Sequence, residues 1–441
     1  MRETLTAPAM ERPEENLPAK SGIEKKEKRE EGETRNLDFY TTTHMVDDPE
    51  HWNQEKFREH VTLLKASGID FMAYDWSWTR VNPSAGEFDQ RQIECYKQAK
   101  KIMAEAGMKS PTVIFTVAPD FVKELYEQGK NDQRKKAGFY GAYREYITRV
   151  KEALVACGGE KIETFQIFNE LNAKMYTFVE PEDIPEMCRI TREVFHDYNP
   201  DLKLKATLAA NSLAEAASKV GQATGIMEYL DRNKEMLREN FDKIAVDYYP
   251  GIWHWPLKEA GLGVTDFLFN RNKTKDIFKQ TGLLEKIFSE LSDWEGTEYE
   301  IGEYGLPTNE PWSDEDKQRY AFDVFARALR KVIDKLWQEG KALPKSFGIY
   351  ESSNRLPRNE GEIKMKKRSL NLWPEHDFGL TGADNEPKEI LRGRRPSSKR
   401  MLKKLLPGLG ALEEKQASGE PQLLRIKKYL NRPFVKADKN K

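Results

Sequence analysis

The segment Thr164-Phe165-Gln166-Ile167-Phe168-Asn169-Glu170 is an apolar, strand-like run that ends on a carboxylate. A second run of this kind, Tyr299-Glu300-Ile301-Gly302-Glu303, follows much later in the chain. Carboxylates are costly to place beside apolar strand ends, so two such placements indicate a site that needs them there. Paired carboxylates are also the minimum set of groups for cleaving a glycosidic bond.

The composition sets broad limits on the fold and the partners. The 441 residues, 38% hydrophobic and 33% charged, suffice for one large domain or two ordinary ones. A formal net charge of −1 gives no overall attraction to nucleic acid or to an anionic membrane. No apolar run resembles a signal-peptide core or approaches the roughly 20 residues needed to cross a bilayer. We therefore expect a cytoplasmic protein without a membrane span.

The cysteines and the two ends of the chain carry no predicted chemistry. Cys95, Cys157 and Cys188 are widely spaced and form no CxxC motif, so neither a disulfide framework nor a zinc site is expected. Residues 1–36 are rich in Glu, Lys and Arg and predict a disordered, charged tail. Residues 413–441 are polar and mostly basic and predict a solvated tail. The interval 37–412 is then left as a single domain.

Within this interval, short strand patterns alternate with longer helical patterns. We predict strands at Leu37–Thr43, Phe71–Asp75, Thr112–Val117, Thr164–Asn169, Leu204–Leu208, Lys243–Tyr249, Glu298–Glu303 and Ser346–Glu351. Helical patterns include Gln54–Ser67, Gln90–Ala106, Gly141–Ala156, Pro185–Tyr198 and Asp314–Gln338. Such alternation favours parallel βα units over an antiparallel sandwich. The strand count matches an α/β fold of the (β/α)8 TIM barrel type.

A doubly wound sheet could use many of the same elements, but it usually begins with a glycine-rich phosphate turn, and no such fingerprint occurs here. In a barrel, active residues come from the carboxyl ends of the strands and the loops that follow. Glu170 and Glu303 occupy those positions on the predicted fourth and seventh strands.

Several segments together resemble the clan A glycoside hydrolases, which are retaining (β/α)8 enzymes, over roughly Leu37 to Leu412. Asn169-Glu170 and Glu303 match the catalytic pattern of the clan, and the run from Trp76 to Asp89 is similar to its segment after the second strand. The nearest likeness is to families 39, 42, 5 and 1. The resemblance implies that Arg80 lies beneath the nucleophile and helps to keep it ionised, because a neighbouring cation favours a charged carboxylate.

The end of the sixth strand, Val246-Asp247-Tyr248-Tyr249, also resembles the clan, in which a polar residue and a tyrosine lie two apart. Strand periodicity puts Asp247 and Tyr249 on one face and Tyr248 on the other. The match implies that Tyr249 hydrogen-bonds Glu303. The segment from Asp377 to Lys388 resembles the clan's segment before the final helix. Many relatives have a tryptophan where this chain has Tyr350, and a histidine after the third strand, where it has Val117-Ala118-Pro119.

The resemblance implies a double displacement with retention of configuration. Glu303 would attack the anomeric carbon, and Glu170 would act first as general acid and then as general base. This mechanism needs the two carboxyl groups about 5 to 5.5 Å apart, with one ionised and the other protonated at the start. Asn169 would hydrogen-bond the sugar 2-hydroxyl.

Aromatic residues gather in the segments where a substrate would lie, and sugar rings stack on such side chains. We expect Trp78, Tyr176, Trp253 and Trp312 to contact a carbohydrate or glycoconjugate substrate, with Trp253 and Trp312 favoured among them. His44 could reach a sugar hydroxyl or cap the segment after the first strand, and Asp247 is the polar candidate on the sixth strand. No cofactor and no metal site is predicted.

Three other interpretations stay open on the sequence. A transglycosylase would differ only in the acceptor of the second step. A carbohydrate-binding pseudoenzyme or scaffold barrel is compatible with the altered third and eighth strands. A nucleic-acid role would depend on the basic C-terminal stretch alone and is not expected. The sugar, the linkage and the oligomeric state are not predicted.

Overall fold

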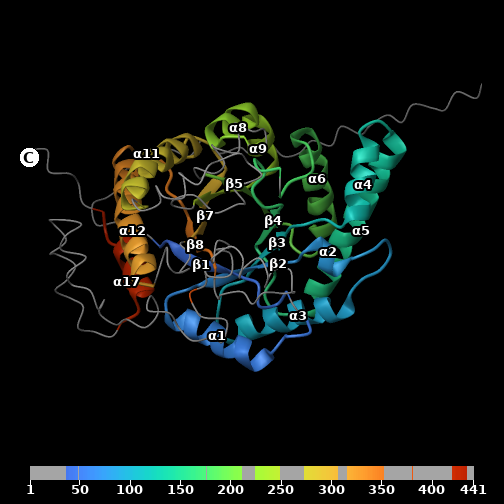
Figure 1. The fold of residues 1–441 in the computed structure, drawn as a ribbon, viewed down its shortest axis with the longest axis horizontal. Coiled ribbons are helices and arrows are strands. Elements are labelled where there is room, and N and C mark those ends of the chain that lie inside the picture. The colour runs from blue at the N-terminus through green and yellow to red at the C-terminus, as the bar shows by residue number, and fades with distance from the viewer. Residues whose placement is uncertain are drawn as a thin grey trace, which may run out of the picture.

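The computed structural model describes residues 36–47, 49–174, 176–210, 224–248, 273–305, 315–351, 380 and 420–434, with backbone only at 273–281, 315–317 and 320. Its strands form a closed barrel in the order β1-β2-β3-β4-β5-β6-β7-β8, and every neighbouring pair is parallel. Helices surround the strands (Figure 1). The predicted (β/α)8 barrel is therefore confirmed.

The strands lie where the apolar runs predict them. They are β1 Asp38–Thr43, β2 Phe71–Asp75, β3 Thr112–Phe115, β4 Thr164–Ile167, β5 Lys203–Ala209, β6 Lys243–Tyr248, β7 Glu298–Tyr304 and β8 Ser346–Ile349. The helices among the described residues are α1 Gln54–Ala66, α2 Trp78–Val81, α3 Gln90–Glu105, α4 Asp120–Gly129, α5 Gln133–Ala156, η1 Pro181–Asp183, α6 Ile184–Phe195, α8 Ile226–Arg232, α9 Lys234–Asn240, α11 Lys273–Leu291, α12 Glu315–Gln338 and α17 Gln422–Leu430.

Local chemistry explains the boundaries that differ from the prediction. Helix α5 begins at Gln133 instead of Gly141, because Asp132 caps it by accepting a hydrogen bond from the Arg134 backbone N–H. Strand β4 ends at Ile167 instead of Asn169, because Phe168 has a φ of 60°, which is incompatible with an extended strand.

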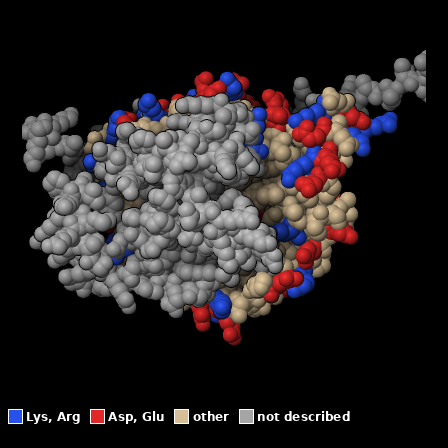
Figure 2. All heavy atoms as spheres, viewed as in Figure 1, with Lys and Arg blue, Asp and Glu red and all other residues tan. Residues whose placement is uncertain are grey.

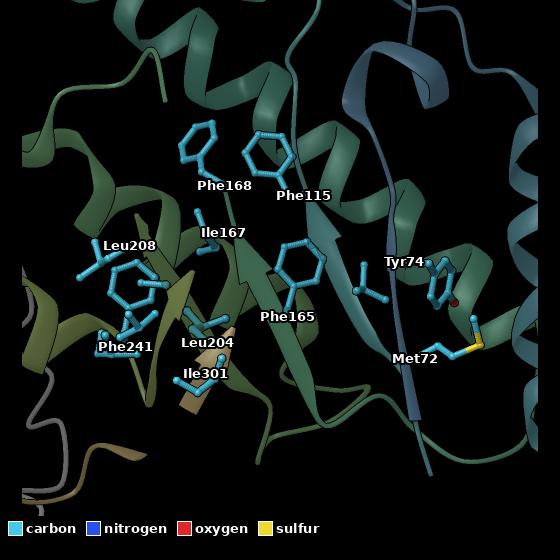
Figure 3. Packing of buried hydrophobic residues seen from close by; sticks show 14 of the residues in the cluster. Met72, Tyr74, Phe115, Phe165, Ile167, Phe168, Leu204, Leu208, Phe241 and Ile301 are labelled. Atoms are coloured by element: carbon cyan, nitrogen blue, oxygen red, sulfur yellow. The ribbon is translucent and has the colours of Figure 1, made fainter. Parts of the chain in front are cut away.

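Alternating side chains divide each strand between two environments. Outward-facing residues such as Phe165, Ile167, Leu204 and Leu208 join the main hydrophobic core between the barrel and its helices (Figure 3). Burial of this surface is the dominant favourable contribution to folding. The barrel interior is mixed: Tyr40, Ala73 and Ile114 form a small apolar cluster there.

The other part of the interior is a buried ionic network. Lys205 Nζ lies 2.7 Å from Glu300 Oε1, and both side chains are at most 4% exposed. Lys205 also donates to the Tyr40 hydroxyl at 3.0 Å, and that hydroxyl donates to the Gly302 carbonyl at 2.7 Å. Burial opposes ionisation of Glu300, but the ammonium groups of Lys205 and Lys243 outweigh it and lower its pKa from 4.5 to about 2. The barrel therefore contains a buried charged pair in its interior.

The C-terminal segment corrects one prediction. Residues 420–434, expected to belong to a solvated tail, include helix α17, which packs beside α12 (Figure 1). Lys427 donates to Asp70 Oδ1 at 2.6 Å, and Asn431 Oδ1 accepts from the Leu37 backbone N–H at 2.7 Å. The apolar spacing of Leu423, Ile426 and Leu430, all buried, was the signal for a packed helix.

Other sequence predictions lie partly outside the described residues. Residues 1–35 of the expected N-terminal tail and residues 413–419 and 435–441 of the expected C-terminal tail are among these. Of the segment from Asp377 to Lys388, the structure describes Leu380, which is fully buried and donates its backbone N–H to the Glu351 carbonyl at 3.0 Å.

The described surface carries charges of both signs. On the face shown in Figure 2, acidic and basic side chains intermingle over the described part. None of the helices in the described residues combines the length and the apolar character needed to cross a lipid bilayer.

Candidate active site

Glu170 lies in a tight turn at the carboxyl end of β4. Phe168 and Glu170, on either side of Asn169, both have positive φ angles of 60° and 47°. Non-glycine residues rarely adopt this left-handed conformation, which costs about 1 to 3 kcal/mol and clusters at functional sites. The Glu170 side chain is 8% exposed. The backbone therefore holds this carboxylate in an unusual and largely buried position.

Thr207 on the neighbouring strand β5 fixes this turn. Its hydroxyl accepts a hydrogen bond from the Glu170 backbone N–H at 2.7 Å and donates to Asn169 Oδ1 at 3.2 Å. Its carbonyl accepts from the Leu171 backbone N–H at 2.9 Å. One side chain thus orients both members of the Asn-Glu pair.

Replacing Thr207 by valine, which keeps the shape and removes the hydroxyl, is expected to leave the Glu170 backbone N–H without its partner. An unsatisfied buried donor costs about 1 to 3 kcal/mol, so we expect the free energy of unfolding to fall by that amount. Denaturant titration measures it. Thr207→Ser keeps the hydroxyl and should retain most of the stability. Equal losses in both variants would show that the methyl group matters more than the hydrogen bonds.

Glu303 lies near the end of β7, and a β-bulge decides the direction of its side chain. Val246 pairs with Ile301, whereas the next residue, Asp247, pairs with Glu303, so Gly302 is an extra residue in β7. Without it, strand alternation would put Glu303 on the same face as Ile301, which packs in the outer core. The bulge brings Glu303 onto the face of Asp247. Beyond it, Tyr248 and Tyr304 both stack on Phe325 of α12, facing outward.

Asp247 connects the two glutamates electrostatically. It is fully buried, and burial, then the charge of Glu303, then that of Glu170 raise its pKa well above the usual range of an aspartate. Both glutamate charges therefore act on one carboxyl group. The barrel brings together residues 170, 247 and 303, which come from three separate parts of the sequence.

Arg80 has a different partner from the predicted one. Its guanidinium forms an ion pair with Asp47, which follows β1, and it does not pair with Glu303 among the described residues. His44 Nδ1 also contacts Asp47 Oδ2 at 2.9 Å. Burial disfavours the charged form of Asp47, but Arg80 and His44 outweigh it and hold its pKa well below the usual range. The arginine therefore neutralises a carboxylate that follows the neighbouring strand β1.

The same cluster contains the one group of possible metal ligands found among the described residues. Ligand atoms of His44, Asp47 and Asp75 all lie within 4.8 Å of one another. Asp75 Oδ2 accepts a hydrogen bond from the Thr116 hydroxyl at 2.5 Å, and the Arg80 cation already pairs with Asp47. A metal ion would have to compete with that guanidinium.

The predicted ligand-binding residues divide into three groups. Trp78 was predicted to contact the substrate, and the structure corrects this. It is fully buried in α2, stacks on Tyr146 and donates its indole N–H to Asn82. Its ring is therefore part of the core. His44 and Tyr176 are half-buried in the segments after β1 and β4. Tyr249, Trp253 and Trp312 lie outside the described residues.

Several polar residues of the barrel were missed by the sequence reasoning. Lys205 and Thr207 alternate with the outward-facing Leu204, Ala206 and Leu208, so strand periodicity could have placed both inside the barrel. Glu300 shows the same signal between Tyr299 and Ile301. Asp47 has no comparable signal, because it lies in an irregular segment.

Solved glycoside hydrolase structures share the fold of this chain. A family 5, subfamily 18 glycoside hydrolase from Streptomyces cattleya in complex with GlcNAc matches with a TM-score of 0.55 and 14% identity, over 81% of this chain and 78% of that one. The fold is that of these glycoside hydrolases. An exo-β-1,4-mannosidase from Opitutaceae bacterium strain TAV5 matches with a TM-score of 0.54 and 13% identity, over 81% of this chain and 58% of that one.

The barrel chain is shorter than some of these proteins. It spans 62% of a family 39 glycoside hydrolase from Bacteroides cellulosilyticus WH2, which matches with a TM-score of 0.48 and 16% identity. No protein-family model and no curated protein sequence matches the chain. The structural likeness agrees with the resemblance to clan A at the level of the fold and leaves the individual family undetermined.

Proposed function

We propose that this protein is a retaining glycoside hydrolase that cleaves a β-glycosidic bond through a covalent glycosyl-enzyme intermediate. The observation that carries the proposal is the placement of Glu170 and Glu303 at the carboxyl ends of β4 and β7, both largely buried and both acting on Asp247. In a closed parallel barrel, that end of the strands is where catalytic groups lie.

In the proposed reaction, a carboxylate oxygen of Glu303 forms a bond to the anomeric carbon while the bond to the leaving oxygen breaks. Glu170 gives its proton to that oxygen. In the second step Glu170 takes a proton from water, the water oxygen bonds to the anomeric carbon, and Glu303 leaves as a carboxylate. Two displacements restore the original configuration.

Asn169 is the proposed contact to the sugar 2-hydroxyl, where hydrogen bonds strengthen in the transition state. Its Oδ1 atom accepts from Thr207, so the Nδ2 donor is the atom that we assign to the sugar. Tyr249 is proposed to hydrogen-bond Glu303. His44, Tyr176, Trp253 and Trp312 are the proposed contacts to the rest of the substrate.

The test of this proposal is hydrolysis of a panel of β-linked aryl glycosides. The panel includes β-mannosides and β-N-acetylglucosaminides, because an exo-β-1,4-mannosidase and a complex with GlcNAc are among the proteins that share the fold. Nuclear magnetic resonance of the first-formed sugar reports its configuration. A product of inverted configuration would contradict the double displacement.

Replacing Glu170 by glutamine is expected to lower kcat for substrates with poor leaving groups by about 10²- to 10⁴-fold, the usual contribution of general acid–base catalysis. Azide should restore turnover of an activated aryl glycoside and yield a β-glycosyl azide, because a small anion needs no general base. Glu163→Gln, an exposed position just before the amino end of β4, is the matched control. Azide rescue that is absent from Glu170→Gln would contradict the assigned role.

A carbohydrate-binding barrel without hydrolytic activity is the second candidate. The observation that favours it is the ion pair between Arg80 and Asp47, which occupies the arginine that the clan's pattern implies for the nucleophile. A wild-type protein that binds an oligosaccharide in calorimetry, yet releases no product from it, would support this candidate over the enzyme.

A further inference from the structure

Asp247 is a carboxyl group in an unusual setting. Its side chain is fully buried, and neither of its oxygens has a hydrogen-bond partner among the described residues. It packs tightly against the bulge of β7: a Cβ atom added to Gly302 would lie 2.1 Å from Asp247 Oδ1. The bulge glycine therefore makes the space that this carboxyl group occupies, directly beside Glu303, its partner in the strand register.

The groups that face Asp247 from the surrounding elements are mostly acidic. Among the residues that the structure describes, they are Glu303 and Glu300 on β7, Glu170 after β4, Lys205 on β5 and Tyr40 on β1. Lys205 is the one cation in this set, and it already forms an ion pair with Glu300 at 2.7 Å. An ionised Asp247 would add a further buried negative charge beside two glutamates, which is costly in a low dielectric.

A neutral Asp247 resolves this conflict. Burial and the neighbouring glutamates raise its pKa well above the usual range, in spite of the opposing charge of Lys205. A protonated carboxylic acid has an O–H donor, which an ionised carboxylate lacks. Carboxyl groups that share a buried site commonly divide in this way, one staying protonated while its neighbour is charged.

We propose that Asp247 keeps its proton in the working enzyme and acts as a positioning residue, whose O–H, unpaired among the described residues of this structure, rotates to donate to the neighbouring Glu303 carboxylate. This inference rests on the proposed function, since it gives Glu303 the role of nucleophile. The donor holds the oxygen of Glu303 that does not attack the sugar and stabilises its charged form. The proton stays on Asp247 through both displacements, so the balance of the reaction is unchanged.

The first arm of the test needs no substrate: it compares the free energy of unfolding of the wild type with that of Asp247→Asn from about pH 4 to 8. The unfolded chain releases this proton near its ordinary pKa, about 3.9, whereas the folded protein keeps it. Because the pKa of Asp247 is raised in the folded state, this group contributes to the free energy of unfolding at low pH, and its contribution declines as the pH rises. The wild type should therefore lose stability relative to Asp247→Asn as pH rises. A difference that stays constant, or changes in the opposite direction, would overturn the inference.

The second arm measures the pH profile of kcat/KM. Asp247→Asn keeps a neutral donor of the same shape, so we expect kcat/KM within about threefold of the wild type and an unchanged acidic limb. Asp247→Ala lacks the donor and should lower kcat/KM by about 10- to 100-fold and move the acidic limb to higher pH, because the charged form of Glu303 loses a hydrogen bond. Activity that is lost equally in both variants would contradict a neutral donor.

The two arms separate this inference from the proposed function. A wild type that hydrolyses nothing on the panel refutes the proposed function, while the unfolding measurements still decide whether Asp247 carries a proton. If the Asn variant fails to fold, the inference is overturned, because a neutral residue of the same shape should be tolerated at this position.

Discussion

Glu303→Gln is expected to lower kcat/KM for β-aryl glycosides by about 10⁴-fold or more, the order found when a nucleophile is removed from an enzyme. An amide cannot form the glycosyl ester, so azide can displace the leaving group only in a single step that inverts the anomeric carbon, and no β-glycosyl azide should form. The bulge at Gly302 directs Glu303 into the mouth, so glutamine should occupy the same position without refolding of the strand. Steady-state kinetics with the preferred aryl glycoside measure the loss.

The matched control is Glu298→Gln, at the amino end of the same strand, where the carboxylate pairs with Lys203 at 2.9 Å near the surface. This variant should keep the wild-type rate. Trapping of a fluorinated glycoside on the protein provides a further check by mass spectrometry of peptides. A label on any residue other than Glu303 would contradict the assignment.

Lys205→Met is expected to reduce the free energy of unfolding by about 3 to 5 kcal/mol, the usual cost of leaving one member of a buried ion pair alone. The change takes the nearest cation away from the buried Glu300 carboxylate and removes the donor to the Tyr40 hydroxyl. Urea or guanidinium titration at neutral pH measures the difference.

Lys203→Met is the matched control, two residues earlier on β5, because its pair with Glu298 is partly exposed. Exposed pairs contribute about 0 to 1 kcal/mol, so its effect should be small. The loss of unfolding free energy caused by Lys205→Met should also become smaller as the pH falls. Glu300 has a folded-state pKa lowered from 4.5 to about 2, so its contribution is complete above 4.5 and is lost as pH falls toward 2. A loss that is independent of pH over this range would contradict an ionic role.

Much of the fold could be predicted from the sequence, because each apolar run with strand periodicity and each amphipathic helix pattern reports directly on burial. Strand β2 matches its predicted bounds, and β6 differs by one residue, Tyr249, which lies outside the described residues. The helix at Gln422–Leu430 was missed because its lysine content indicated solvent, whereas Lys427 lies against Asp70 inside the fold.

The geometry of the site was less predictable. Alternation along β7 would have directed Glu303 outward. Glycine inside a strand often marks a bulge, and Gly302 was the signal that the sequence reasoning did not use. Arg80 pairs with Asp47, which lies in an irregular segment after the neighbouring strand β1. Trp78 was predicted from its place after a strand, but a short helix turns its ring into the core. Strand periodicity predicts which face of the sheet a side chain occupies only where the strand is regular.

The hydrogen bond between Leu37 and Asn431 joins residues that are 394 positions apart. Leu37, the residue just before the first strand, therefore acquires this side-chain partner only after nearly all of the intervening chain has been made. Contacts between such distant residues slow folding, because the loop between them must close first. During synthesis the backbone N–H and carbonyl of Leu37, which the Asn431 side chain engages in the folded protein, have to wait for this late segment. Residues 420–434 thus set the earliest moment at which the newly made protein can finish folding.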